Sequence, residues 1–295
     1  MTVKQQRCVA LGIVLAGMAL ASPQSGERGI VPEDVVQARP LAKTAAPARA
    51  KPQYQALDPQ MVASLRRQTA ASEMGVTIWR LRPAAPEDSG ARILIQEAGE
   101  TVEWTPVRVS STTRLQAGDR VRLTLESPEP GYLYVIDRER YASGERGKPY
   151  LIFPTTRTRS GDNKVSGGKL IDIPAQSDQP NFFTLRRSRP DQAEEDLTVL
   201  LSPQPLEGIH IGPEALELPD EQVSLWENKW GAGKPAVFEL SGGAGRAWTQ
   251  AEQNAAADGT RLLTQDDPPP QTVYRVAVKP GEPLSLQVRL RYGAK

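Results

Sequence analysis

Oxygen-bearing side chains recur between positions 137 and 163, in a segment where short apolar runs alternate with turn residues. The set comprises Asp137, Glu139, Glu145, Asp162 and Asn163. Carboxylate and amide oxygens are the ligands that Ca²⁺ prefers, so loops that converge would gather these side chains into a calcium site. The run Gly161-Asp162-Asn163 is equally typical of a tight turn, in which such side chains bond to nearby backbone. We favour the turn and predict no bound metal.

Aromatic residues are frequent in the same segment, and they include Tyr132, Tyr134, Tyr141, Tyr150 and Phe153. Rings that are exposed side by side form surfaces that bind sugars or peptides. Strand alternation sends about half of such residues into a core instead. From the two sets together we take Asp137, Tyr141, Asp162 and Asn163 as candidate binding residues.

Motifs for hydrolytic catalysis are absent from the sequence. A zinc site of the His-Glu-x-x-His kind needs two histidines, and the chain has only His210. A serine-histidine-aspartate triad would also depend on His210, and the Gly-x-Ser-x-Gly elbow around a nucleophilic serine does not occur. His210 follows the exit of an expected strand, so we expect a structural or solvent-facing histidine.

Three shorter motifs are similar to functional motifs, but the residues around them do not match the full pattern. Two Gly-Lys pairs, at 168–169 and 233–234, lack both the upstream glycine of a phosphate-binding loop and the magnesium-binding hydroxyl after the lysine. An Asp-Ser-Gly run at 88–90 is similar to an aspartic-protease loop, but it has no second copy and follows Pro86 instead of an apolar strand. We therefore predict no catalytic residues and no cofactor.

Alternation of apolar and polar residues dominates from Val76 onward and predicts the elements that hold these side chains. Val121, Leu123 and Leu125 alternate with polar residues such as Arg122, which is typical of a strand with one buried and one solvent-facing side. Further strand-like segments, separated by Gly and Pro, are 76–81, 92–96, 101–110, 132–137, 150–153, 169–173, 182–186, 197–202 and 236–240. Many short strands at this spacing predict an all-β or β-rich fold, an antiparallel, immunoglobulin-like sandwich.

The C-terminal region adds a few short helices and a hairpin. Thr249 and Glu252 have capping-box spacing ahead of an alanine-rich helix, and residues 220–230 are typical of a helix or a loop. The segments 272–279 and 284–292 alternate and are joined by Pro-Gly-Glu-Pro, which predicts a hairpin. Because an isolated hairpin with one apolar face is marginal in water, we expect it to dock on the sandwich.

The N-terminus predicts export. Lys4 and Arg7 precede an uncharged stretch of 14 residues ending at Ala21, which is shorter than the about 20 residues of a transmembrane helix and typical of a signal peptide, residues 1–21, that is cleaved. Cleavage leaves 34 basic and 35 acidic residues and removes Cys8. We therefore expect no nucleic-acid binding, no stable membrane insertion after cleavage and no disulfides.

Domain organisation follows from composition. Residues 22–75 are rich in Pro and Ala and predict an extended linker with a possible short helix near 59–72. Residues 76–295 predict one β-sandwich domain, made of a core at 107–206 and a C-terminal extension at 207–295.

The order of motifs from about Val107 to Leu206 resembles one bacterial family. The motifs are GDRVRLTLES, PGYLYVID, LIFP, GDNKV, IDIP, FTL and LTVLLSPQPL, and as an ordered set they are similar to the domain-of-unknown-function family numbered 4384. That family is known from exported proteins and from proteins in which it is joined to peptidase or kinase domains. The resemblance implies a β-rich accessory or interaction module, and it brings no catalytic residues to this chain.

These observations predict an exported, non-catalytic binding or protein-interaction module of the bacterial cell envelope, periplasmic or secreted. Its partner would be an envelope protein, or a glycan or peptide ligand. Two alternatives stay open: an envelope hydrolase with dispersed carboxylates, or an accessory subunit of one, and a structural scaffold. Carboxylates that converge in one concave pocket would favour the hydrolase.

Overall fold

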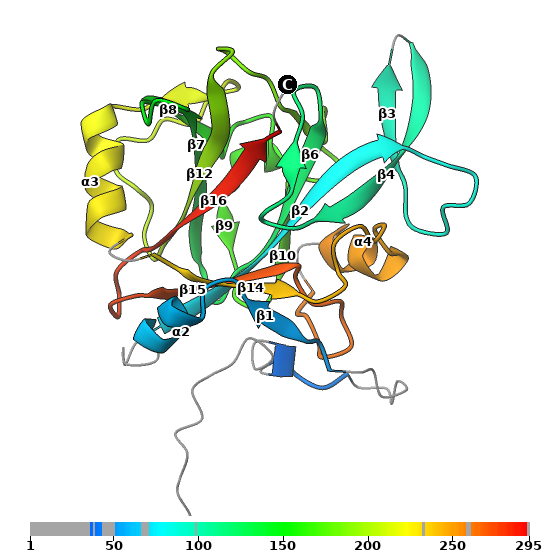
Figure 1. Cartoon of the computed structure of the whole chain (residues 1–295), viewed down its shortest axis with the longest axis horizontal. Coiled ribbons are helices and arrows are strands. Elements are labelled where there is room, and N and C mark those ends of the chain that lie inside the picture. Colours follow the sequence, from blue (N-terminus) through cyan, green and yellow to red (C-terminus); the bar gives the residue numbers. More distant parts are fainter. Residues whose placement is uncertain are drawn as a thin grey trace, which may run out of the picture.

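Two β-sheets packed face to face form the body of the protein (Figure 1). This computed structural model describes residues 36–37, 39–42, 51–65, 71–97, 99–231, 234–257 and 261–293. The predicted signal peptide, residues 1–21, lies outside the described residues. Within these ranges, none of the helices is long and apolar enough to cross a membrane. The predicted β-rich sandwich with a few short helices is confirmed.

Sheet A has the strand order β1-β14-β15-β2-β4-β3, and β6, followed by β10 and β11, pairs with the other edge of β2. Its strands are β1 (Tyr54–Ala56), β2 (Ala71–Pro83), β3 (Ile93–Glu97), β4 (Glu100–Val109), β6 (Arg120–Glu126), β10 (Leu170–Ile173), β11 (Phe183–Thr184), β14 (Ala236–Leu240) and β15 (Thr272–Ala277). The sheet begins before position 76, earlier than we expected. The start of β2 pairs with β15, a distant partner that the local sequence does not reveal.

Sheet B has the order β13-β8-β7-β12-β16-β5, and the short β9 pairs with β7. Its strands are β5 (Arg114–Leu115), β7 (Gly131–Tyr141), β8 (Arg146–Phe153), β9 (Lys164–Val165), β12 (Gln192–Ser202), β13 (Leu216–Glu217) and β16 (Leu284–Tyr292). The C-terminal strands β15 and β16 do not pair with each other, because β15 belongs to sheet A and β16 to sheet B. The expected hairpin is therefore a connection that crosses from one sheet to the other.

Short α-helices of the described ranges lie outside the sheets, among them α2 (Pro59–Leu65), α3 (Asp220–Trp230) and α4 (Gln250–Ala257). The Asp58 carboxylate accepts the backbone N–H of Gln60 and begins α2, which satisfies a donor that the first helical turn leaves free. The predicted capping box begins α4, where Thr249 N donates to Glu252 Oε2 and Glu252 N donates to Thr249 Oγ1. Helix α3 packs on the outer face of sheet B through Trp226. A single 3-10 turn, η1, spans Arg159–Gly161.

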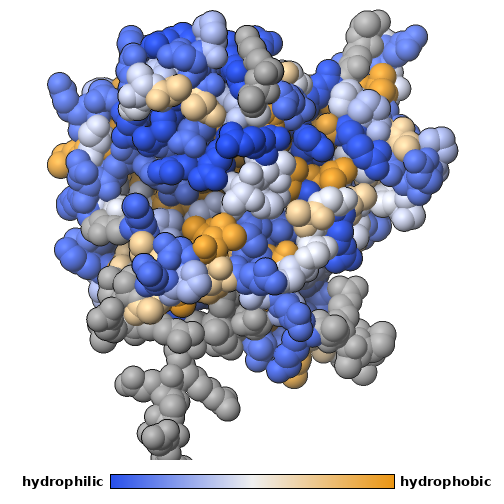
Figure 2. Space-filling model, in the orientation of Figure 1, coloured by the Kyte–Doolittle hydropathy of each residue, from blue (hydrophilic) through white to orange (hydrophobic). Residues whose placement is uncertain are grey.

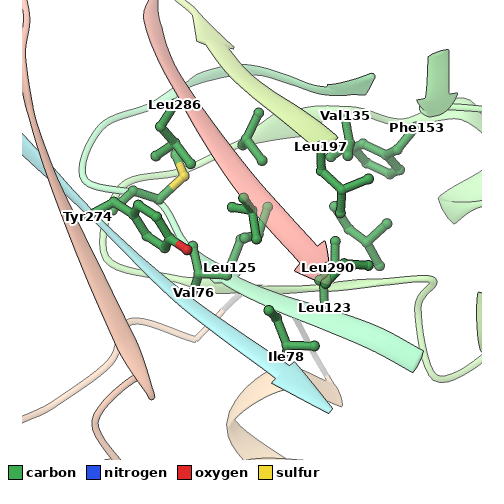
Figure 3. Packing of buried hydrophobic residues seen from close by; sticks show 14 of the residues in the cluster. Val76, Ile78, Leu123, Leu125, Val135, Phe153, Leu197, Tyr274, Leu286 and Leu290 are labelled. Atoms are coloured by element: carbon green, nitrogen blue, oxygen red, sulfur yellow. The ribbon is translucent and has the colours of Figure 1, made fainter. Parts of the chain in front are cut away.

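Apolar side chains from both sheets fill the space between them (Figure 3). Val121, Leu123 and Leu125 of β6 are at most 2% exposed, so the predicted core face of this strand is confirmed. Leu197 of β12 and Leu286 of β16 reach the same core from sheet B. Burying each such side chain contributes about 1.5–3 kcal/mol, so this cluster is the main source of stability.

The opposite face of β6 is also buried, and the expectation that Arg122 faces solvent is wrong. Arg122 is 1% exposed, donates to Asp172 Oδ2 at 3.1 Å, and lies over the Trp248 ring at 5.3 Å. Trp248 lies just before α4, which packs against β10 beside β6. Alternation within one strand predicts which residues share a face, but it cannot predict cover from a segment more than a hundred residues away.

Candidate functional site

Two of the four candidate binding residues, Asp137 and Tyr141, lie together on β7. Leu133 and Val135 of this strand enter the core between the sheets, so alternation turns Asp137, Glu139 and Tyr141 toward the same side. On the neighbouring strand β12, Glu195 is directly opposite Glu139. We call Asp137, Glu139 and Glu195 the carboxylate cluster.

Hydroxyl and amide donors hold the cluster in place. Glu139 Oε2 accepts hydrogen bonds from Tyr141 Oη and from Ser188 Oγ, the latter at 2.7 Å. Glu195 Oε1 accepts from Tyr292 Oη at 2.7 Å and from Gln192 Nε2 at 2.8 Å. The hydrogen bond to Glu139 raises the pKa of Tyr141. The tyrosine is therefore a hydrogen-bond donor at neutral pH and not a nucleophile.

Two further carboxylate oxygens of the cluster are buried without a donor. Asp137 Oδ1 and Glu195 Oε2 make no hydrogen bond with any residue of the described ranges. Burial raises the pKa of Glu195 to about 7, and the charge of Glu139 acts in the same direction. Asp137 is partly exposed as a residue, yet burial of its carboxyl group and the charges of Glu195 and Glu139 raise its pKa well above the ordinary value. The cluster therefore binds protons at neutral pH that free carboxylates would release.

A protonated carboxyl group beside an ionised one is the arrangement of a general acid and base. Such chemistry needs a cavity that brings a substrate to the carboxyl groups. The larger cavities found in the described part of the chain, of about 670, 680 and 410 Å³, are lined by other residues. The carboxylates therefore converge, but none of these cavities reaches them, so the structure adds no support for the hydrolase.

The other two candidates, Asp162 and Asn163, lie in a turn before β9 and have structural partners. Asp162 Oδ1 accepts the backbone N–H of Lys164 at 2.9 Å. Asn163 is 8% exposed and its Nδ2 donates to the carbonyl of Leu133 at 3.1 Å. In the part of the chain that the structure describes, no three His, Cys, Asp or Glu side chains are grouped to hold a metal ion. His210 is exposed in the loop after β12.

A groove of about 680 Å³ lies beside β16 of sheet B and is also lined by residues of β14 and β15 of sheet A. We call it the β16 groove and define it by Lys234, Val237, Tyr274, Leu286, Arg289 and Arg291, which line it with others from α3 and the turn after β4. A volume of this size is typical of ligand sites. In the space-filling view, a small apolar area lies near the middle of the face that β16 crosses, among hydrophilic side chains (Figure 2).

Positive charge is in excess along one wall of the β16 groove. Arg146 is neutralised by Glu227, to which it donates two hydrogen bonds of 2.8 and 2.9 Å. Arg289 and Arg291 share one acidic neighbour, Glu194, at 3.9 and 3.7 Å, and they are about 40% exposed. Lys234 is exposed and forms no ion pair within the described ranges. These three cations leave the groove ready for an anion.

The other wall of the groove is apolar and joins the core. Leu286 and Tyr274 belong to the cluster between the sheets and also line the groove, and Figure 3 shows them side by side. Tyr274 is 3% exposed, and burial raises the pKa of its hydroxyl group. Its hydroxyl makes no hydrogen bond with a residue of the described ranges, although most buried hydroxyl groups have one. A ligand in the groove would meet an apolar wall with one vacant polar group.

The β16 groove is not indicated by any motif of the sequence. Its residues come from six separate segments, and a net charge near zero gave no sign of a local excess. One local signal was present: Arg289 and Arg291 alternate with leucine, so both arginines share the face of β16 that points away from the core.

Comparison with known proteins indicates neither a family nor a function for the chain. No family model matches the chain, and no curated protein or solved structure matches it. The resemblance of residues 107–206 to the family numbered 4384 stays a prediction.

Proposed function

We propose that this protein is an exported, non-catalytic binding module of the bacterial cell envelope, and that it holds an anionic ligand in the β16 groove. The observation that carries the proposal is the surplus of positive charge from Lys234, Arg289 and Arg291 in a cavity of ligand size. Export by a cleaved signal peptide, to the periplasm or the medium, is part of the same proposal and rests on residues 1–21.

Binding fits the groove better than catalysis. Its acidic residue, Glu227, is held by Arg146 and Thr198. Burial is the largest single influence and acts to raise the pKa of Glu227, but the hydrogen bonds and charge of Arg146, together with Thr198 and Arg138, outweigh it in sum and lower the pKa. Glu227 therefore stays ionised and hydrogen-bonded, so it is a poor general acid or base. The arginines and the lysine supply charge and hydrogen bonds, which recognise an anion without reacting with it.

The test is an equilibrium titration with two fluorescent octapeptides, one of alternating glutamate and valine and one of alternating lysine and valine. We expect the acidic peptide to bind and its affinity to fall as salt is added, because exposed charge pairs are screened. Arg289→Ala with Arg291→Ala should weaken binding by about tenfold, the loss expected for two exposed charge pairs. Lys164→Ala with Lys169→Ala removes two cations outside the groove and should change nothing. Equal binding of both peptides, or of neither, would overturn the proposal.

A further inference from the structure

We propose that the anionic ligand is an extended acidic segment of a partner protein, and that it adds to sheet B as a strand along the open edge of β16. The inference rests on the function proposed above and specifies how the same groove works. It requires three things of the groove: unpaired backbone, walls that suit alternating side chains, and a charge that selects the partner.

The backbone of β16 is unpaired on one edge. The strand pairs with β12 from Leu284 to Arg291, but on its other side β5 pairs only with Arg291 and Tyr292. In the described part of the chain, the edge from Leu284 to Leu290 has no partner strand. Alternate N–H and C=O groups along such an edge are free to pair with an incoming strand. Seven residues span about 23 Å, enough for a peptide of six or seven residues.

The two walls of the groove suit the two faces of a strand. A strand added beside β16 would turn every second side chain toward Leu286, Val237 and Tyr274, where apolar groups are favourable. The side chains between them would face the side of Arg289, Arg291 and Lys234. A peptide that alternates acidic and apolar residues satisfies both walls, whereas a small anion would contact only the basic one.

The charge of the groove disfavours two segments of this chain and a second copy as occupants. Residues 43–50 contain Lys43 and Arg49 and no acid, and residues 66–70 contain two arginines and no acid. These segments carry the same sign of charge as the groove, so they are poor occupants. A second copy that paired through β16 would bring its own Arg289 and Arg291 against the first pair, which like-charge repulsion disfavours. An acidic segment of another protein has neither conflict.

Arginines at a strand edge have a competing explanation. Charged residues often protect an exposed edge against pairing with other chains. If the arginines only protect the edge, they keep every incoming strand away from β16. An acidic peptide would then form no backbone hydrogen bonds with β16. The two explanations therefore differ in what happens to the backbone of β16 when an acidic peptide is present.

The experiment uses the glutamate–valine octapeptide in two N-methylated forms, one methylated at its valines and one at its glutamates. In an edge strand only one of these sets of N–H groups points at β16. We expect one form to lose about tenfold or more in affinity, since several backbone hydrogen bonds are lost, and the other form to bind like the parent. Equal losses, or none, would overturn strand addition while anion binding still stood.

Amide hydrogen exchange supplies the second readout. We expect the parent peptide to protect alternate amides between Leu284 and Leu290, while the lysine–valine peptide protects none. Binding of the acidic peptide without this protection would overturn strand addition but leave the proposed function intact. Failure of the acidic peptide to bind would overturn both, and self-association of the Arg289→Ala, Arg291→Ala variant would then identify the arginines as protection of the edge.

Discussion

Replacing Glu195 by glutamine should stabilise the protein at alkaline pH. The carboxyl group lies opposite Glu139, is 6% exposed, and has one oxygen with no hydrogen-bond donor in the described ranges. Glutamine keeps the accepting oxygen for Tyr292 and Gln192 but removes the charge. The substitution therefore removes the cost of an ionised, buried group while it preserves the hydrogen bonds.

The size and sign of the effect follow from the pKa of Glu195. Burial raises it from an ordinary 4.5 to about 7. A carboxyl group whose pKa is higher in the folded state contributes its full stability below pH 4.5 and loses it as the pH rises through 7. The difference in pKa corresponds to at most roughly 3.5 kcal/mol, because one pKa unit is about 1.4 kcal/mol. Wild type and Glu195→Gln should be equally stable near pH 4.5, and the variant should be more stable at pH 8.

Urea unfolding at a series of pH values measures this difference directly. Glu194→Gln is the matched control, since Glu194 is on the opposite face of β12 and pairs with Arg140 at 3.1 Å. Loss of that pair should leave the control less stable than wild type at pH 8, or at best equal to it. The reasoning would be refuted if the two proteins had equal free energies of unfolding at pH 8, or if wild type were the more stable there. It would also be refuted if the difference between them were the same at every pH.

Three further predictions concern the fold and export. Leu123→Ala should lower the free energy of unfolding by about 2–5 kcal/mol because it opens a cavity in the core, and Arg122→Ala by about 3–5 kcal/mol because it leaves the buried charge of Asp172 without its ion-pair partner; urea unfolding of each checks this, and a loss below about 1 kcal/mol for Arg122→Ala would contradict its buried position. Deletion of residues 270–295 removes one strand from each sheet and should give an aggregated or unfolded product, as light scattering and circular dichroism would show; a monomer with the wild-type midpoint would contradict the two-sheet assignment. The exported protein should begin at Ser22, and an intact mass that retains Met1 would contradict cleavage.

Much of the fold was predictable because local alternation fixes which side chains of a strand share a face. The core face of β6, with Val121, Leu123 and Leu125, followed from that pattern, and so did the start of α4 at Thr249. Alternation could not predict what surrounds the opposite face of β6, which carries Arg122. Arg122 is buried by Trp248 and Asp172, and nothing near Arg122 in the sequence indicates either contact.

The candidate site was predictable only in part, for the same reason. Asp137 and Tyr141 come together because alternate residues of one strand are neighbours, whereas Asp162 and Asn163 satisfy their own turn. Glu195 completes the carboxylate cluster from β12, and its role depends on strand register. The β16 groove depends further on side chains that the fold brings together from both sheets, α3 and the turn after β4, and no local pattern indicates that arrangement.

The central claim is that the charge of the β16 groove selects the ligand, and a charge-reversal experiment tests it most directly. Lys234→Glu combined with Arg289→Glu changes two exposed side chains that line the groove. Titration of wild type and variant with the glutamate–valine and lysine–valine octapeptides should show that wild type prefers the acidic peptide and the variant prefers the basic one. An unchanged preference in a variant that keeps the wild-type unfolding midpoint would contradict the account.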